Sequence, residues 1–563
     1  MRFTRSTAMW LVVAFAAPTS VYLGMNQTSF GRDWQGGVTG AQEKNPDQPR
    51  PERRHVGFRE CVRCHNSGVT GDIVLPGGAK LALMKEQWVL YKEYPIWAEK
   101  DKHGQAYAVL LNERSKSMGK LLGVAEVHRD PRCLACHTGF PLSRMKPGKD
   151  GLVHRDLEKD LDINLGVSCE GCHGPSGDYR SDKVVLLGWM DPHQIAPKPP
   201  YEQAWRFKSP REKQSQYGFY DVRSPASKTK LCVSCHLGDV ELGRIVTHEM
   251  FAAGHPPLPG FEVETFTQQM PGHWVEFSAK SKQVRELFVE HTKDELYARK
   301  AYKRDGLPRT RSMLVGAVIT ASEYLRQVSQ LADEEVKSPV RRPAWPEFAA
   351  FDCYACHHEL KSPSWRQERK PAGKIPGRPA LHDWPFALAR IALKNAGVSR
   401  GDVDAPFANL RDAIYRKPFG DQLAASKAAR LAAAWLREKG LEIEKKPLDK
   451  DDGIAILKDI IATGSRETLD YESARQLVWA YNVIDKELRS EYPGAKKVHA
   501  LLEPMGKDTL LLDLRKYRKA TIVVGGQRRT TEEVDLHIVL PFVSSYQPAE
   551  FRKRFGAIGA LLK

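Results

Sequence analysis

Apolar positions recur at helical spacing over long parts of the chain, and this period predicts a mainly α-helical fold. Two such stretches, about 281–304 and 310–335, are expected to form a helical hairpin. Two more cover 421–440 and 465–489. The second of these is expected to begin at Ser465, because a Ser-x-x-Thr start there precedes acidic residues.

Strand signals are few. Residues 520–526 and 534–543 are rich in β-branched and apolar side chains, and we expect them to pair as two short strands. The sequence therefore predicts a fold in which helices and loops dominate.

The N-terminal segment 1–30 has the pattern of an export signal. Arg2 and Arg5 precede an apolar run from Ala8 to Met25, as a charged region precedes the apolar core of a signal peptide. A run of about 18 residues is also near the lower limit for a membrane span, so an uncleaved anchor is the alternative. Both alternatives place the rest of the chain outside the cytoplasm, and we expect a periplasmic protein.

All ten cysteines belong to five copies of one pattern, Cys-x-x-Cys-His, and none is left over. In chain order the copies are Cys61, Cys64 and His65; Cys133, Cys136 and His137; Cys169, Cys172 and His173; Cys232, Cys235 and His236; and Cys353, Cys356 and His357.

This spacing is the attachment signature of c-type haem. Two thiols three residues apart lie on one helical turn, where both can add to the vinyl groups of one porphyrin. The adjacent histidine then binds the iron as its proximal ligand. Zinc sites and thioredoxin-like redox pairs also use Cys-x-x-Cys, but neither requires a histidine after every pair. The sequence therefore predicts five covalently attached haems.

The chain is basic, with 86 Lys and Arg against 69 Asp and Glu and a formal net charge of +17. This sign favours an anionic partner. Haem propionates neutralise part of the excess, and an exported haem protein is a poor candidate for nucleic-acid binding. The remaining charge suits acidic redox proteins as partners. The identity of donor and acceptor, association with a membrane complex and oligomer formation stay open.

Thirteen histidines lie outside the five motifs, which is enough to give every iron a second axial histidine. Methionine is the alternative sixth ligand. Three histidines cluster after the fourth motif beside small or aromatic residues, and we expect them to be distal ligands: His248, His255 and His273.

Three features resemble the cytochrome c-554 family over about 58–274. They are Trp97 six residues before His103, the sequence GV-x-CE-x-CHGP at the third motif, and the spacing of the first four motifs. The fifth motif resembles that of extended multihaem relatives. The resemblance implies that His103 is a distal haem ligand. Where the family has a histidine shortly after the third motif, this chain has Lys183, and His193 is the nearest substitute.

These patterns divide the chain into a signal peptide or anchor and four further parts. We expect a linker at 31–56, a pentahaem cytochrome c domain at 57–360 with the helical insert at about 281–335, a second linker at 361–380, and a mostly helical, haem-free domain at 381–563. In the cytochrome domain the porphyrins are expected to form the core, with many loops around them.

Electron transfer between periplasmic or membrane redox partners is the function that these patterns favour. The alternative is an oxidoreductase that acts on a small nitrogen or sulfur compound at one iron with an open position. The resemblance makes the second haem the candidate for that position, because its counterpart in the family carrier is five-coordinate. The Cys-x-x-Cys-Lys motif typical of pentahaem nitrite reductases does not occur in this sequence.

Overall fold

The computed structural model describes residues 52–66, 88–140, 142, 145, 147–154, 164–179, 184–185, 188–194, 199–297, 306–358, 362, 364–365, 378–524 and 526–561. The expected signal peptide, most of the first linker and most of the second linker lie outside these residues.

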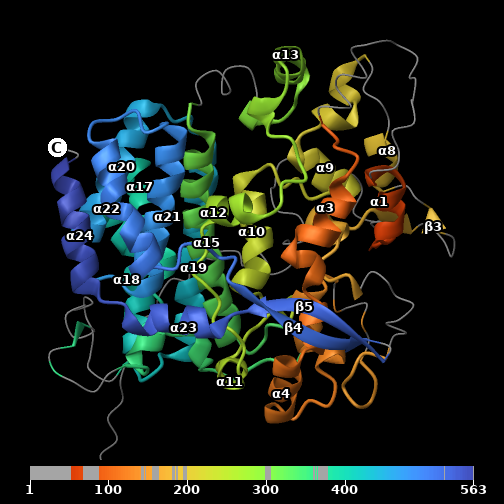
Figure 1. Cartoon of the computed structure of the whole chain (residues 1–563), viewed down its shortest axis with the longest axis horizontal. Coiled ribbons are helices and arrows are strands. Elements are labelled where there is room, and N and C mark those ends of the chain that lie inside the picture. The colour runs from red at the N-terminus through yellow and green to blue at the C-terminus, as the bar shows by residue number, and fades with distance from the viewer. Residues whose placement is uncertain are drawn as a thin grey trace, which may run out of the picture. The chain divides into compact units, whose positions relative to one another are not determined.

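The fold is mainly α-helical, as predicted (Figure 1). Up to the fifth motif the elements are β1 (Glu52–Arg54), α1 (Phe58–His65), α3 (Glu93–Lys100), η1 (Lys102–Gln105), η2 (Ala108–Leu111), α4 (Glu113–Leu121), η3 (Val127–Arg129), α5 (Pro131–His137), α7 (Cys169–His173), β2 (Gly177–Tyr179), β3 (Val184–Val185), α8 (Met190–Gln194), η5 (Tyr201–Gln203), η6 (Trp205–Phe207), α9 (Pro210–Tyr217), α10 (Pro225–His236), α11 (His248–Ala252), α12 (Val263–Gln269), η7 (Phe277–Ala279), α13 (Lys282–His291), η8 (Glu295–Tyr297), α15 (Pro308–Ala332), η9 (Phe348–Ala350) and η10 (Cys353–Ala355).

A helical bundle follows. Its elements are α17 (Trp384–Asn395), α18 (Arg400–Tyr415), α19 (Gln422–Glu444), α20 (Lys450–Arg466), α21 (Tyr471–Glu487), α22 (Ala495–Pro504), η11 (Met505–Thr509), β4 (Tyr517–Val524), β5 (Gln527–Val534), α23 (Leu536–Ser545) and α24 (Pro548–Leu561).

The centre of the largest hydrophobic core is α15. Nearly all of its residues are buried, and most of them are apolar or small and lie on every side of the helix instead of forming one stripe. It packs against α10 from the motif-bearing part and against α17 and α19 from the bundle. In contrast, α13 places Phe288 against Phe207 in a separate small cluster. The predicted hairpin is therefore replaced by two helices that join different clusters.

Small residues let α19 approach α15 closely. Ala425, Ala429 and Ala432 of α19 are fully buried. Ser322 of α15 donates its hydroxyl to the carbonyl of Ala433 across the contact, at 2.7 Å. This close packing joins the segment before the fifth motif to the bundle after it.

The strand prediction is half wrong. Residues 520–524 do lie in a strand, β4, but its antiparallel partner is β5, which has a polar sequence. Residues 536–545 form helix α23 instead, because the Asp535 side chain accepts the backbone N–H of His537 and caps a helix there. A separate sheet pairs β1 with β2 and β2 with β3, so part of the expected first linker is a strand.

The expected helix start at Ser465 is also wrong. Ser465 lies in the last turn of α20, and the next helix begins after Asp470, whose carboxylate accepts the backbone N–H of Ser473 at 2.7 Å. An aspartate N-cap satisfies an unpaired helix donor and therefore fixes the start.

Within the described residues, no helix combines the length and the apolar character that crossing a bilayer requires.

Candidate haem sites

Each of the first four motifs lies on a helix that ends at its histidine. These helices are α1, α5, α7 and α10, whereas the fifth motif begins in the single turn η10. The two thiols of each helical motif therefore lie within one turn, as porphyrin attachment requires. The described residues contain no cluster of three or more His, Cys, Asp or Glu that could hold a metal ion in place of haem.

Three motif histidines each face one of the predicted distal histidines. The ring centroids are 6.4 Å apart for His65 and His193, with planes 11° apart. They are 6.1 Å apart for His103 and His236, with planes 84° apart.

The third pair joins His248 to His357 of the fifth motif, with centroids 6.0 Å apart. An imidazole nitrogen binds a metal at about 2 Å, so two imidazoles on opposite sides of one iron have centroids about 6 Å apart. The spacing of all three pairs therefore fits one iron between two histidines.

The other two motif histidines each have a predicted distal histidine as a close electrostatic neighbour. Burial, and after it the nearby His273, lowers the pKa of His173 to about 4. Burial, and after it the nearby His137, lowers the pKa of His255 to about 4. These two neighbours complete a set of five motif histidines with five different companions.

Hydrogen bonds orient four of the five predicted distal histidines through Nδ1. The Nδ1 atom lies 2.9 Å from Asp101 Oδ1 in His103, 2.8 Å from the carbonyl of Pro256 in His255, and 3.4 Å from the carbonyl of Pro271 in His273. In His193, Nδ1 lies 3.1 Å from the carbonyl of Trp189. A hydrogen bond from Nδ1 fixes the tautomer that leaves Nε2 free to bind a metal.

Two motif histidines follow the same rule. Nδ1 of His137 lies 2.6 Å from the carbonyl of Ala106, and Nδ1 of His65 lies 3.1 Å from Glu93 Oε2. Histidines that we did not predict as ligands are mixed: His291 engages Nδ1, which lies 2.7 Å from Glu202 Oε1, whereas others engage Nε2. His154 binds Asp150 through that atom, and His382 binds the carbonyl of Ala349 at 3.0 Å.

The sequence pattern around His103 has a direct structural reason. The indole N–H of Trp97 donates to the carbonyl of Val167 at 3.1 Å, and the backbone N–H of Val167 donates to the carbonyl of His103 at 2.9 Å. Gly166 has φ of 71°, and a Cβ there would lie 2.4 Å from the His103 oxygen. The Trp-x5-His stretch and the Gly-Val stretch before the third motif therefore form one packed unit.

Glu170, between the two cysteines of the third motif, ties this motif to the first. Its side chain is buried and accepts the backbone N–H groups of Val56 and Gly57, which precede α1, at 3.1 and 2.9 Å. It also accepts the Ser176 backbone N–H at 2.7 Å. A buried carboxylate with three backbone donors is well compensated and fixes the chain around it.

The motifs follow one another in space in a different order from the sequence. His65 of the first motif adds to the lowering of the pKa of His173 of the third. Cys172 of the third motif is an electrostatic neighbour of Cys232 of the fourth.

The fourth, second and fifth motifs continue this series. The thiols of Cys136 and Cys235 share a hydrogen bond. The segment that carries both His248 and His255 then joins the fifth motif to the second. The spatial series is first, third, fourth, second, fifth, and the third motif also lies beside the second, because a Cβ on Gly171 would be 3.7 Å from Gly139 Cα.

Comparison with protein families decides the class of one segment of the N-terminal part. The family model described as "Cytochrome c554 and c-prime" matches residues 91–174. This segment is a cytochrome c554 family domain. It includes Trp97, His103 and the second and third motifs, and membership implies covalently bound haem c.

The cytochrome c554 match covers part of the 58–274 stretch over which the resemblance was expected. A comparison with curated proteins and one with solved structures gave no significant match.

Sequence reasoning missed the carboxylates that support the histidines. Asp101, Glu93 and Glu170 are ordinary acidic residues in the sequence, and their partners lie up to 114 residues away. Glu170 alone carried a signal, as the acidic residue of the CE-x-CH pattern.

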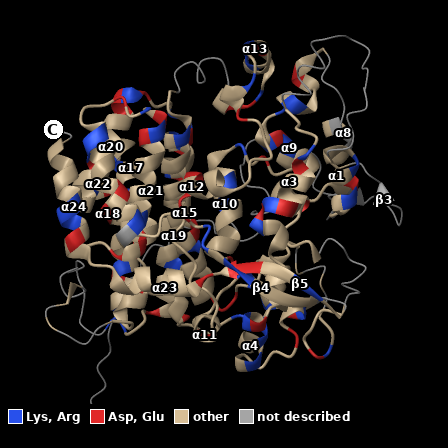
Figure 2. Cartoon of the chain, in the orientation of Figure 1, with Lys and Arg blue, Asp and Glu red and all other residues tan. Residues whose placement is uncertain are grey.

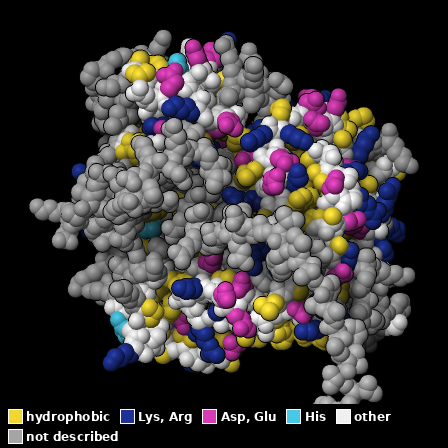
Figure 3. Space-filling model, turned by 180° about the vertical axis from the view of Figure 1, so that it is seen from behind, with side chains coloured by type: hydrophobic (Ala, Val, Ile, Leu, Met, Phe, Trp, Pro, Cys, Tyr) yellow, Lys and Arg dark blue, Asp and Glu magenta, His cyan; other side chains and the backbone are white. Residues whose placement is uncertain are grey.

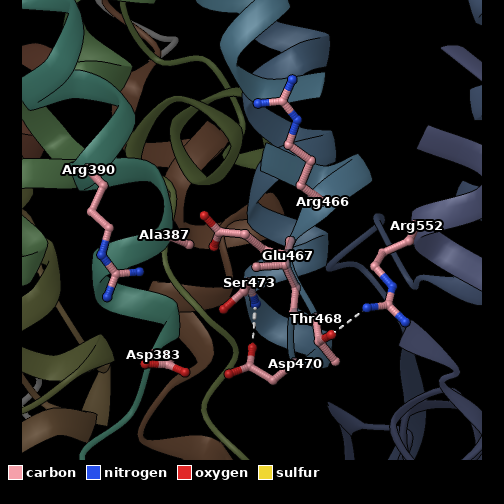
Figure 4. Close-up of a pocket in the computed structure, with 10 residues that line it drawn as sticks. Asp383, Ala387, Arg390, Arg466, Glu467, Thr468, Asp470, Ser473 and Arg552 are labelled. Atoms are coloured by element: carbon pink, nitrogen blue, oxygen red, sulfur yellow. Dashed lines mark hydrogen bonds between the residues drawn. The ribbon is translucent and has the colours of Figure 1, made fainter. Parts of the chain in front are cut away.

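One pocket of about 400 Å³ lies in the helical bundle, and Asp470, which lines it, is an electrostatic neighbour of Cys353 of the fifth motif (Figure 4). Arg390, Arg466 and Arg552 line it together with Asp383, Glu467 and Asp470. Its charges are therefore balanced, and Arg552 is bonded to Thr468 at 2.6 Å.

Proposed function

We propose that this protein is an exported pentahaem c-type cytochrome that carries electrons between redox partners, with each iron bound by two histidines. The observation that supports this most directly is the three pairs of histidine rings 6.0–6.4 Å apart. The proposed pairs are His65 with His193, His137 with His255, His173 with His273, His236 with His103, and His357 with His248. Haem bound at these sites would supply reversible one-electron chemistry at the iron.

The residues of this chain would set the properties of those sites. Nδ1 contacts hold six of the ten imidazoles in place, so little rearrangement at these six accompanies a change of charge. The spatial series of motifs supports a continuous route from the first to the fifth motif. Cys64 and the cysteines of the fifth motif are exposed, which supports access to the route from the surface at both ends.

The enzyme alternative finds less support. It requires an iron with a free position, and the second motif was its candidate. The electrostatic effect of His137 on the pKa of His255 supports a second histidine there as well.

The partner is proposed to be a redox protein with an acidic surface. The formal charge of +17 supports this, although basic and acidic side chains are intermingled over the helices and over the rear face (Figures 2 and 3). Long-range steering by net charge would then raise the rate of encounter at low salt.

Two optical measurements test the proposal. The pyridine haemochrome of the purified protein should give five haems per chain. Addition of cyanide, nitrite or hydroxylamine to the ferric protein should leave its spectrum unchanged, because every iron already has two ligands. Rapid binding with turnover of nitrite or hydroxylamine would contradict the carrier function.

Two matched variants identify the ligands. His248→Ala should open one iron to cyanide, whereas His382→Ala should open none, because His382 uses Nε2 for a backbone carbonyl. Equal behaviour of both variants would contradict the pairing of His248 with His357.

A further inference from the structure

The hairpin of β4 and β5, far from His103 along the chain, lies against the segment that follows this histidine. It packs on η2 and α4, and a backbone bridge joins Asn112 to Ile522. Figure 1 shows the two long strands crossing the part of the molecule that contains α4. The hairpin is outside the cytochrome c554 match, so that match gives it no role.

Glu533 of β5 anchors this contact. Its carboxylate accepts the side-chain amide of Asn112 at 2.7 Å and lies 3.1 Å from Arg114 Nη2. It also accepts Arg518 Nε from the neighbouring strand at 2.8 Å. The Glu533 side chain is 7% exposed and that of Arg114 is 16% exposed, so these charge-assisted hydrogen bonds are largely shielded from water.

A second contact reaches the residue next to His103. Lys102 forms an ion pair with Glu532, and its ammonium lies 4.7 Å from the ring centroid of Tyr517 in β4. Arg114 also donates to the carbonyl of Val534 at 3.0 Å. The hairpin therefore holds both ends of the segment 102–114.

The base of the hairpin is bonded to the surroundings of His236. Gln269 of α12 accepts the backbone N–H of Leu514 at 2.8 Å, and the indole N–H of Trp479 donates to the carbonyl of Leu512 at 2.9 Å. Phe266 lies between, 6.1 Å from the Trp479 ring and 5.3 Å from the His236 ring. One continuous segment thus contacts the surroundings of both histidines of this pair.

We propose that the β4–β5 hairpin is a positioning strap that holds His103 at the fourth haem, with Glu533 as its main anchor. This inference rests on the proposed function, because it takes His103 as the distal ligand of the haem attached at Cys232 and Cys235. Glu533 touches neither histidine and acts through the backbone of 102–114.

The test measures cyanide binding to the ferric holoprotein and its low-temperature EPR spectrum. In the Glu533→Gln variant the carboxylate charge is lost and Arg114 faces Arg518 without it. The segment then opens more often, and cyanide should bind at one haem roughly tenfold faster than in the wild type. The EPR signal of that same haem should change, and the low-spin signals of the other haems should be the same as in the wild type.

Two comparisons make the outcome decisive. Glu335→Gln changes an exposed carboxylate and should leave both measurements at the wild-type value. His103→Ala should open one iron completely. If His103→Ala opens no iron, the ligand assignment is wrong; if it opens one but Glu533→Gln behaves like the wild type, the strap is wrong and the ligand assignment stands.

A milder variant covers the case in which Glu533→Gln does not accumulate as folded protein. Glu532→Gln removes only the half-exposed pair with Lys102 and should speed cyanide binding at the same haem by a smaller factor. An unchanged rate in that variant would overturn the proposal.

Discussion

The Asp101 carboxylate contacts Nδ1 of the His103 imidazole. From this contact we predict a property of the fourth haem. Asp101 is 2% exposed, and its Oδ1 lies 2.9 Å from His103 Nδ1. A carboxylate at Nδ1 raises the basicity of the imidazole, which stabilises ferric iron. Asp101→Asn should therefore raise the reduction potential of one haem by roughly 60 mV. For a one-electron couple, this shift equals a tenfold change in the equilibrium constant for reduction.

A spectroelectrochemical titration measures this shift. The same substitution at Asp459, which pairs with Lys394 at the bundle surface, serves as the control and should leave every potential in place. A downward shift in Asp101→Asn would contradict the role assigned to the carboxylate.

A second residue-scale prediction concerns acid stability. Asp221 is buried, accepts Arg223 Nε at 2.8 Å and lies 3.3 Å from Lys213 Nζ. Although burial opposes it, the charges of Arg223 and Lys213 hold the pKa of Asp221 far below its usual range. In the unfolded state the pKa of this carboxyl is about 4. As pH falls towards that value, the unfolded state therefore binds a proton at Asp221 and the folded state does not.

The sign of the pH effect follows. The stabilisation by Asp221 is fully present above about pH 4 and is lost as pH falls below it. Asp221→Asn should lower the free energy of unfolding by about 3 kcal/mol at pH 7, because the buried Lys213 loses its partner and Arg223 keeps only the longer contact with Asp294. Denaturant titrations at pH 7 and pH 3 should show a smaller difference between the two proteins at pH 3; an equal difference at both would contradict the assignment.

At the scale of elements, the packed unit of Trp97, Val167 and His103 predicts that Gly166 cannot be replaced. Gly166→Ala places a Cβ 2.4 Å from the His103 carbonyl oxygen at a φ of 71°. We expect a loss of about 2 kcal/mol of unfolding free energy. Gly151→Ala is the matched control, since Gly151 also has positive φ but its added Cβ would meet nothing within 4 Å. Equal costs for the two variants, measured by thermal unfolding, would mean that the contact with His103 is unimportant.

The sequence predicted these elements unevenly. The helix α19 followed from its periodicity, and the motif helices followed from cysteine spacing. The strand β5 did not, because its polar residues make contacts with 102–114 that only the tertiary structure provides. The apolar stretch of α23 predicts a strand by residue type, but the Asp535 N-cap favours a helix there.

The ligands show the same limit. Residue type and clustering made His248, His255 and His273 candidates, and the family resemblance made His193 one, but neither said which motif each histidine faces. His193 lies opposite the first motif, although the third motif is nearer to it in the sequence. His103 lies opposite the fourth motif, although the second and third motifs stand between them in the sequence. Such pairings depend on how α8 and η1 pack, and the sequence pattern around each histidine does not contain that information.

At the scale of the whole molecule, the motif-bearing part and the helical bundle share one hydrophobic core. Residues from Ala226 of α10 to Ile558 of α24 belong to the same cluster, with α15 at its centre. The bundle also supplies Trp479 and the β4–β5 hairpin to the surroundings of the fourth motif. We therefore expect the bundle to be required for the arrangement of the proposed haems.

The most direct test of the account is low-temperature EPR of the fully ferric protein. Five irons with two histidines each should give low-spin signals alone. The ring planes make the prediction finer, because parallel imidazoles and perpendicular imidazoles give low-spin signals of different anisotropy. His65 and His193, 11° apart, should give an ordinary rhombic signal, and His103 and His236, 84° apart, a strongly anisotropic one. A high-spin signal equivalent to one haem per chain would contradict the five histidine pairs and restore an open iron as the centre of the function.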